Sequence, residues 1–160
     1  MIIMSNIDDK LIAEATTVMN TVKDLQAASA LLGWDQETYM PDGAAESRAE
    51  QLATLDTLAH HKLTGDSTSA IVEKIRPNLN GGTTRTERLM RLFIREYDKA
   101  SKLPERLVHH TSKATALAQE SWKKARAASS FPIFRDDLKK LLDPWILYRC
   151  SYDQYTGKSN

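Results

Sequence analysis

Apolar residues recur every three or four positions along most of this chain of 160 residues, and this spacing indicates amphipathic α-helices. We predict that the first stripe ends at Gly33, because a glycine commonly terminates a helix. Met40 cannot lie inside a helix, because Pro41 disfavours helical geometry in the residue before it. Residues 34–43 are therefore predicted to form a loop. The first stripe consists of Ile7, Leu11, Ala15, Val18, Met19, Val22, Leu25 and Leu32.

Further helices follow from the same spacing. One covers about residues 44–62, a short one ends near Pro77, and one begins at Thr84, where Thr84 and Glu87 have the spacing of a capping box. In this last helix Leu89, Leu92 and Phe93 are predicted to face inward. A longer helix begins near Pro104, and a final short one ends at Leu142.

The predicted fold class is all-α, an antiparallel bundle of five to six amphipathic helices. No alternating run of β-branched residues competes with the helical periodicity. From Asp143 this periodicity is lost and a proline follows at once. The sequence therefore predicts a helical domain over residues 1–142 and an irregular tail over residues 143–160.

Charge and composition exclude several classes of partner. The 22 basic and 21 acidic residues are interspersed and give a formal net charge of +1, so we expect no nucleic-acid partner. No apolar run approaches the roughly 20 residues that span a membrane, so no membrane partner is expected. The single cysteine, Cys150, fits a reducing compartment, and we expect a cytoplasmic protein.

One group of basic residues follows helical spacing: Arg85, Arg88, Arg91 and Arg95. Such a row can be a phosphate-binding stripe or a solvated helix face. Acidic residues at Glu87, Glu96 and Asp98 lie among the arginines and favour the solvated face.

The most informative segment is Trp34-Asp35-Gln36-Glu37. Its two carboxylates would point the same way on an extended loop, where they could do acid–base work or bind a hard cation. Alternatively, Asp35 caps a turn and Trp34 fills the core, in which case the motif is structural. Trp34→Ala should then cost about 3–5 kcal/mol. Arg48, about one helical turn beyond the loop, could hold Asp35 or Glu37.

The remaining candidates carry weaker signals. The adjacent pairs His60-His61 and His109-His110 lack the spacing of four residues with which a helix presents two metal ligands. Trp122 is expected in the core, and Arg126 is a second arginine that could hold a carboxylate. No residue of the chain is therefore assigned as a metal ligand or a catalytic residue.

An ordered series of motifs resembles the Taq-type zinc metallocarboxypeptidases, specifically their N-terminal helical region, over about residues 28–142. The resemblance implies an all-helical cytosolic peptidase, usually a homodimer, that removes C-terminal residues from peptides with the help of zinc. The matching motifs are WDQETYMP at Trp34–Pro41, Arg48 with Gln51, Arg95–Asp98, Lys102–Pro104, and Trp122 with Arg126 ahead of Phe131 and Phe134.

The chain departs from that family in one decisive respect. The family binds zinc through His-Glu-x-x-His and a later Glu, and this motif occurs nowhere in the 160 residues. We therefore expect a part of an enzyme, inactive alone, whose partners are a second copy of the chain or the missing catalytic region. The alternative is a free-standing helical interaction module built on the same scaffold.

Overall fold

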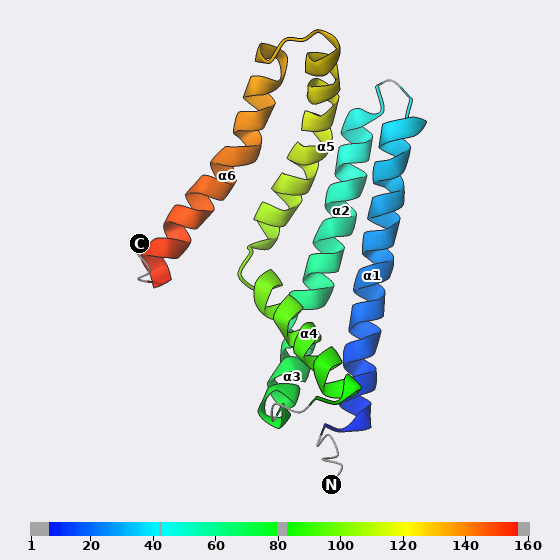
Figure 1. Cartoon of the computed structure of the whole chain (residues 1–160), viewed down its shortest axis with the longest axis vertical. Helices are drawn as coiled ribbons and strands as arrows, with labels where there is room; N and C mark the ends of the chain where they lie inside the picture. Colours follow the sequence, from blue (N-terminus) through cyan, green and yellow to red (C-terminus); the bar gives the residue numbers. More distant parts are fainter. Residues whose placement is uncertain (1–6, 42, 80–82, 157–160) are drawn as a thin grey trace. The chain divides into compact units, whose positions relative to one another are not determined.

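The computed structural model describes residues 7–41, 43–79 and 83–156, for the last stretch with only the backbone of residues 147 and 149–156. These residues form six α-helices and one short 3₁₀ helix, and none of them lies in a strand. The all-α prediction is confirmed. In chain order the elements are α1 Asp9–Thr38, α2 Ala45–Thr64, α3 Asp66–Ile75, η1 Arg76–Asn78, α4 Arg85–Ala100, α5 Glu105–Ala127 and α6 Pro132–Thr156 (Figure 1).

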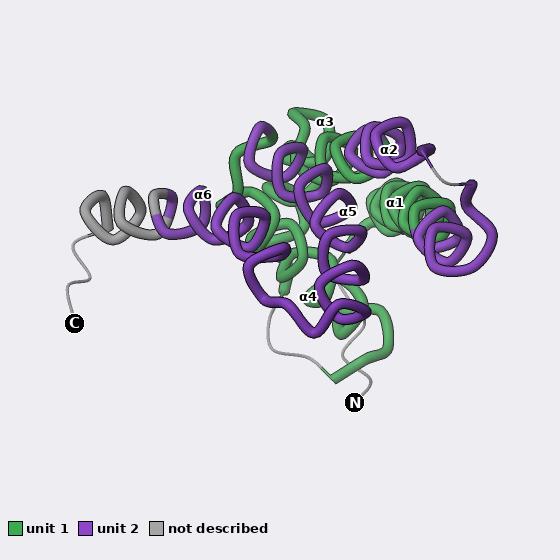
Figure 2. Tube along the Cα trace, turned by 90° about the horizontal axis from the view of Figure 1, so that it is seen from above, with its two compact units in different colours: residues 1–29, 55–105 green, residues 30–54, 106–160 purple. Residues whose placement is uncertain are grey.

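The helices contribute to two compact units, coloured separately in Figure 2. Unit 1 contains Met1–Ser29 and Leu55–Glu105, and unit 2 contains Ala30–Thr54 and Arg106–Asn160. Both α1 and α2 contribute one end to each unit. Unit 1 also contains α3, η1 and α4, whereas unit 2 contains α5 and α6.

Unit 1 is built around a core of large apolar side chains. The stripe predicted for α1 supplies Ile7, Val18 and Val22, and Ile75 and Phe93 are almost completely buried among them. Side chains cap the starts of α1 and α4. Asp8 accepts a hydrogen bond from the backbone of Lys10, and Thr84 and Glu87 form the predicted capping box at the start of α4.

The predicted end of α1 at Gly33 is wrong. The helix continues to Thr38, so five residues of the expected loop, Trp34–Thr38, are helical. Gly33 has no positive φ; the positive φ of 90° occurs at Gly43, where the chain turns toward α2. A glycine inside a helix costs only about 0.5–1 kcal/mol relative to alanine, which the favourable contacts of the following turn offset. The proline rule holds, since Met40 lies outside the helix.

The buried face of α4 is also rotated from the predicted one. Met90, Phe93 and Ile94 are buried, whereas Leu89 and Leu92 are exposed. Successive residues on a helix point about 100° apart, so Met90 and Leu89 cannot both face the same core. The sequence offers apolar residues on both faces, and packing decides between them.

The prediction of an irregular tail from Asp143 is wrong for residues 143–156. α6 continues to Thr156 with Pro144 inside it, and residues 157–160 lie outside the described part of the chain. A proline removes one backbone hydrogen bond at a cost of about 3 kcal/mol, but it does not by itself end a helix. Apolar residues at helical spacing on both sides of it, Leu138, Leu141 and Trp145, continue the pattern.

Candidate functional site

The strongest polar contact of the motif joins α1 to α2 within unit 2. Arg48 donates from Nη2 to Asp35 Oδ2 at 2.6 Å and from Nη1 to the carbonyl oxygen of Leu32 at 2.5 Å. A third bond runs from its Nε to Gln51 Oε1 at 3.1 Å. The Arg48 side chain is only 12% exposed, so these bonds satisfy a largely buried cation. Of the two carboxylates that the sequence analysis offered to Arg48, Asp35 and Glu37, the structure pairs it with Asp35.

Glu37 points elsewhere, because residues two apart on a helix diverge. Its carboxylate lies 3.9 Å from Nζ of Lys123 on α5. The same ammonium donates to the carbonyl oxygen of Gln36 at 3.1 Å and to Glu120 at 3.1 Å. Asp35 and Glu37 therefore do not form a carboxylate pair, and the acid–base and cation hypotheses lose the geometry that they require.

Gln36 is the residue of the motif that the sequence analysis overlooked. It is buried, and its Nε2 donates to the carbonyl oxygen of Ala116 on α5 at 2.8 Å. The signal was available, since Gln36 continues the stripe of Leu25 and Leu32 at helical spacing. Once α1 continues past Gly33, the glutamine falls on its buried face.

Trp34 lies on the opposite side of α1 from Gln36 and is 56% exposed. Its ring contacts Tyr39 edge-on, with 5.8 Å between the ring centroids. The expectation that Trp34 fills the core is wrong, because a helical residue two positions before the buried Gln36 must point away from it. Pro41 lies in the segment between α1 and α2, and its carbonyl oxygen accepts from the backbone of Ala44 at 3.1 Å.

A second ion pair joins α2 to α5. Lys113 Nζ donates to Glu50, and His109 Nε2 lies 3.8 Å from the same carboxylate. The hydrogen bond from Lys113 lowers the pKa of Glu50 below its ordinary value, and the same bond raises the pKa of Lys113. Charged contacts thus recur between the helices of unit 2.

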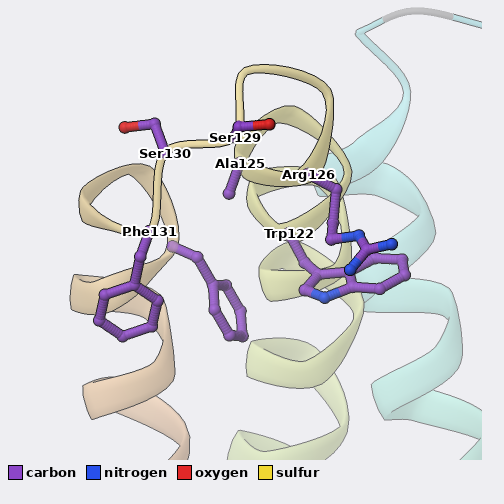
Figure 3. A pocket seen from close by; sticks show the side chains of 7 residues that line it. Trp122, Ala125, Arg126, Ser129, Ser130 and Phe131 are labelled. Atoms are coloured by element: carbon purple, nitrogen blue, oxygen red, sulfur yellow. The ribbon is translucent and has the colours of Figure 1, made fainter.

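Trp122 and Arg126 line a cavity of about 650 Å³ at the turn between α5 and α6. Figure 3 shows the Arg126 side chain lying over the Trp122 indole, with its Cζ 5.9 Å from the ring centroid. Phe131 and Phe134 complete the apolar wall. Trp122 is 47% exposed, so its predicted place in the core is wrong.

The turn that shapes this cavity has a specific backbone geometry. Just beyond the end of α5, Ser129 has a positive φ of 49°. The amides of Ser129 and Ser130 donate to the carbonyl oxygens of Arg126 and Ala125, respectively. This is the Schellman arrangement, in which glycine is the usual residue at the positive φ. Pro132 then occupies the first position of α6, where its missing amide proton costs nothing. The sequence analysis could not find the motif, because a serine stands where a glycine would have marked it.

The cavity can hold an apolar group beside an anion, because a guanidinium and two phenylalanine rings meet there. Among the described residues, its lining includes Ser129 and Ser130, but no histidine or carboxylate that could activate their hydroxyls. Among the side chains that the structure describes, in residues 7–41, 43–79, 83–146 and 148, no three histidine, cysteine or acidic groups gather closely enough to hold a metal ion. His60 instead places Nε2 3.1 Å from the carbonyl oxygen of Ala100.

No helix in the described part of the chain has the length and apolar character that crossing a bilayer requires.

Curated relatives align with most of this chain. Carboxypeptidase 1 of Bacillus subtilis is 24% identical over 126 residues, which are 79% of this chain and 25% of that protein. Thermostable carboxypeptidase 1 of Thermus thermophilus is 29% identical over 119 residues, 73% of this chain and 23% of that protein. Thermostable carboxypeptidase 1 of Pyrococcus furiosus is 30% identical over 118 residues, 72% and 23% of the two chains. The chain thus spans about a quarter of the length of these relatives.

Solved structures share the fold. The structure named "BsuCP Crystal Structure" superposes with a TM-score of 0.79 at 23% identity, covering 87% of this chain and 29% of that one. The structure named "The Structure of CHT" gives a TM-score of 0.59 at 31% identity, covering 84% and 27%.

The family model of the Carboxypeptidase Taq (M32) metallopeptidases matches residues 14–145, which include the Trp34–Pro41 motif, Arg48, Trp122 and Arg126. The match covers well over half of the chain. The chain therefore belongs to the Carboxypeptidase Taq (M32) metallopeptidase family.

Proposed function

We propose that this chain is the N-terminal helical part of a zinc-dependent carboxypeptidase that removes C-terminal residues from peptides, and that it is inactive alone. The observation that carries the proposal is the family match over residues 14–145. The relatives that support it are named carboxypeptidases, and the chain spans about a quarter of their length. The cytoplasm is the compartment that we propose, on the ground of the single cysteine.

The role proposed for the motif around Trp34 is structural. Each of its polar side chains already has a partner: Asp35 binds Arg48, Gln36 binds the backbone of α5, and Glu37 faces Lys123. Such contacts hold one end of α1 against α2 and α5 in unit 2. A group with these partners is poorly placed to exchange a proton with a substrate.

The described residues do not fit the catalytic metal ion that the family name implies, which we propose is zinc. A catalytic zinc ion needs about three protein ligands and an open position for water. No group of three ligand side chains is present in the described part of the chain. We infer that zinc ligands and catalytic groups belong to regions of the relatives beyond the matched quarter.

A chimera tests the proposal directly. Residues 14–145 replace the matched segment of Carboxypeptidase 1 of Bacillus subtilis, and cleavage of a blocked dipeptide is measured with the zinc content. We expect the chimera to bind zinc and to cleave. The matched control carries Arg48→Ala in the same chimera, and its activity should fall in proportion to its folded fraction. A chimera that folds and binds zinc but does not cleave would contradict the proposal.

The isolated chain provides the second arm. Purified without a tag, it should contain no stoichiometric zinc and should not hydrolyse the blocked dipeptide. One zinc ion per chain together with chelator-sensitive cleavage would contradict the proposed inactivity.

The interaction module is the alternative function, and one observation favours it. Several large apolar side chains of unit 2 are exposed, among them Trp34, Trp122 and Phe131. Clustered exposed apolar surface often marks an interface. We propose that the chain self-associates as a symmetric dimer, which light scattering at about 100 μM would detect if the dissociation constant is micromolar. A monodisperse monomer at that concentration would argue against the dimer, and an inactive chimera would then leave the module as the better hypothesis.

A further inference from the structure

A second cavity, of about 490 Å³, lies in unit 1 between η1 and α4. Basic side chains dominate its lining, although the formal charge of the whole chain is only +1. They come from η1, from three successive turns of α4 and from the residues just after it. The basic residues are Arg76, Arg91, Arg95, Lys99 and Lys102.

Apolar side chains complete the cavity, namely Leu79 and Ile94. Among the described residues that line it, Asp98 is the one carboxylate. Apolar neighbours reduce the effective dielectric constant around the basic groups and so strengthen their attraction for an anion. The composition of the lining suits an anionic ligand.

Two of the five basic residues have carboxylate partners. Arg76 binds Asp98 through two bonds, of 2.6 Å and 3.2 Å, and Lys99 lies 3.1 Å from Glu96. Within the described part of the chain, Arg91, Arg95 and Lys102 form no ion pair. Three uncompensated positive charges therefore meet at one cavity.

The four arginines at helical spacing in α4 differ in their relation to this cavity. Arg91 and Arg95 line the cavity with Lys99, whereas Arg85 and Arg88 do not. Residues 91, 95 and 99 are each four positions apart and lie on one face of the helix, where like charges destabilise it. A bound anion would relieve that repulsion.

We propose that this cavity binds a small compound that carries at least two linked phosphate groups. Planar guanidinium groups hold phosphate oxygens in pairs, and two of them stand one helical turn apart at Arg91 and Arg95. The volume lies within the range of small-molecule sites. A nucleic acid would need a basic surface that extends along the molecule, whereas these basic residues gather around one cavity of about 490 Å³.

Titration calorimetry of the full chain with sodium pyrophosphate, in about 0.15 M salt, tests the proposal. The double variant Arg91→Gln with Arg95→Gln should weaken binding about tenfold or more, because charge-assisted hydrogen bonds to phosphate are lost. The matched control, Arg85→Gln with Arg88→Gln, removes the same charge from the same helix outside the cavity. It should change the affinity less than about threefold, because salt screens exposed charges beyond about 8 Å.

A third variant keeps the test valid if the first does not fold. Lys102→Gln changes an exposed residue beyond the end of α4 and should weaken binding severalfold while the melting midpoint stays unchanged. Three results would overturn the proposal. Pyrophosphate binds no more tightly than sulfate, the two double variants weaken binding equally, or a single-stranded oligonucleotide binds more tightly and is released by Arg91→Gln with Arg95→Gln.

Discussion

In unit 1 the large apolar side chains turn inward, whereas in unit 2 many of them lie on the surface. The centre of unit 1 contains Val72, Ile75, Met90 and Phe93, each at most 2% exposed. The buried apolar residues described in unit 2 are Leu107 and small ones: Ala49, Ala53, Ala116, Ala118 and Ala125. Alanine removes far less apolar area from water than leucine or phenylalanine, so unit 2 gains less from the hydrophobic effect.

Polar contacts between helices offset this deficit in unit 2. Arg48, Gln36 and Lys123 each bridge two helices there through a hydrogen bond. Unit 1 has exposed leucines too, at Leu58, Leu89 and Leu92, but it retains a continuous core beneath them. The comparison teaches that apolar packing holds unit 1, whereas directional bonds contribute a larger share in unit 2.

The largest predicted effect tests the core of unit 1. Phe93→Ala should lower the free energy of unfolding by about 3–5 kcal/mol, because it leaves a cavity in a packed core. Phe131→Ala in unit 2 is the matched control. That ring is 58% exposed, so the loss should stay below about 1 kcal/mol. Urea melts followed by circular dichroism measure the free energy of unfolding of both variants. Equal losses would contradict the conclusion that unit 1 depends more on apolar packing than unit 2.

Arg48→Ala tests the polar contacts of unit 2. We expect a loss of about 2–3 kcal/mol, because the carboxylate of Asp35 and the carbonyl of Leu32 lose a charged donor. A double-mutant cycle with Asp35→Ala should show a coupling of about 1 kcal/mol. A coupling energy of zero would mean that Arg48 stabilises the chain through packing alone. It would contradict the conclusion that polar contacts between helices stabilise unit 2.

Trp34→Ala tests whether the motif around Trp34 has a structural role or acts on the substrate. Among the aromatic rings that the structure describes, the half-exposed indole contacts Tyr39, so its removal should cost about 1 kcal/mol, rather than the 3–5 kcal/mol of a buried one. The same variant in the chimera should leave peptide cleavage nearly unchanged. If the urea midpoint is unchanged while cleavage is lost, Trp34 contributes to substrate binding or cleavage, and the structural role proposed for the motif is wrong.

The periodicity of the sequence predicts the helices well but their ends and faces less well. α2 runs over Ala45–Thr64 against about 44–62 predicted, and the capping box at Thr84 is confirmed. The errors at the helix ends share one physical cause. A single residue, Gly33 or Pro144, weakens a helix by an amount that the contacts of neighbouring turns can outweigh, and those contacts are not visible in the sequence.

The candidate site shows the same limit. That Arg48 holds a carboxylate of the motif was predictable, because Arg48 follows the motif closely in the sequence, but the choice of Asp35 over Glu37 was not. The positions of Trp34 and Trp122 were not, since large aromatic residues favour the core on average and only the rotation of each helix decides their exposure. The Schellman turn was hidden for a different reason, because Ser129 occupies a position where glycine is usual.

That turn provides a stabilising prediction for unit 2. Ser129→Gly should raise the free energy of unfolding by about 1 kcal/mol, because glycine adopts a positive φ without the clash of a Cβ atom. Ser130→Gly is the control, since the structure assigns no positive φ to Ser130, and it should not stabilise the chain. The difference between the two urea midpoints decides whether strain at the turn weakens unit 2.

The smallest effect concerns the pH dependence of the charged contacts. Lys113 lowers the pKa of Glu50 below its ordinary value of 4.5, so the folded chain binds a proton there less readily than the unfolded chain. The stabilisation is complete above pH 4.5 and is lost as the pH falls through the lowered pKa. Glu50→Gln should therefore flatten the fall of the urea midpoint between about pH 5 and pH 3.

A matched control isolates this contact from other carboxylates of unit 2. Hydrogen bonds lower the pKa of Asp137, with Lys140 contributing more than Ser121. Protonation of Asp137 at low pH should therefore also lower the urea midpoint. Asp137→Asn should also reduce the fall of the urea midpoint with falling pH. The effects of Glu50→Gln and Asp137→Asn should add, because the two carboxylates have different partners. Glu50 is exposed and Asp137 is partly exposed, so raising the salt concentration should shrink each contribution. A slope that neither variant alters would show that these surface pairs do not contribute to the stability of unit 2.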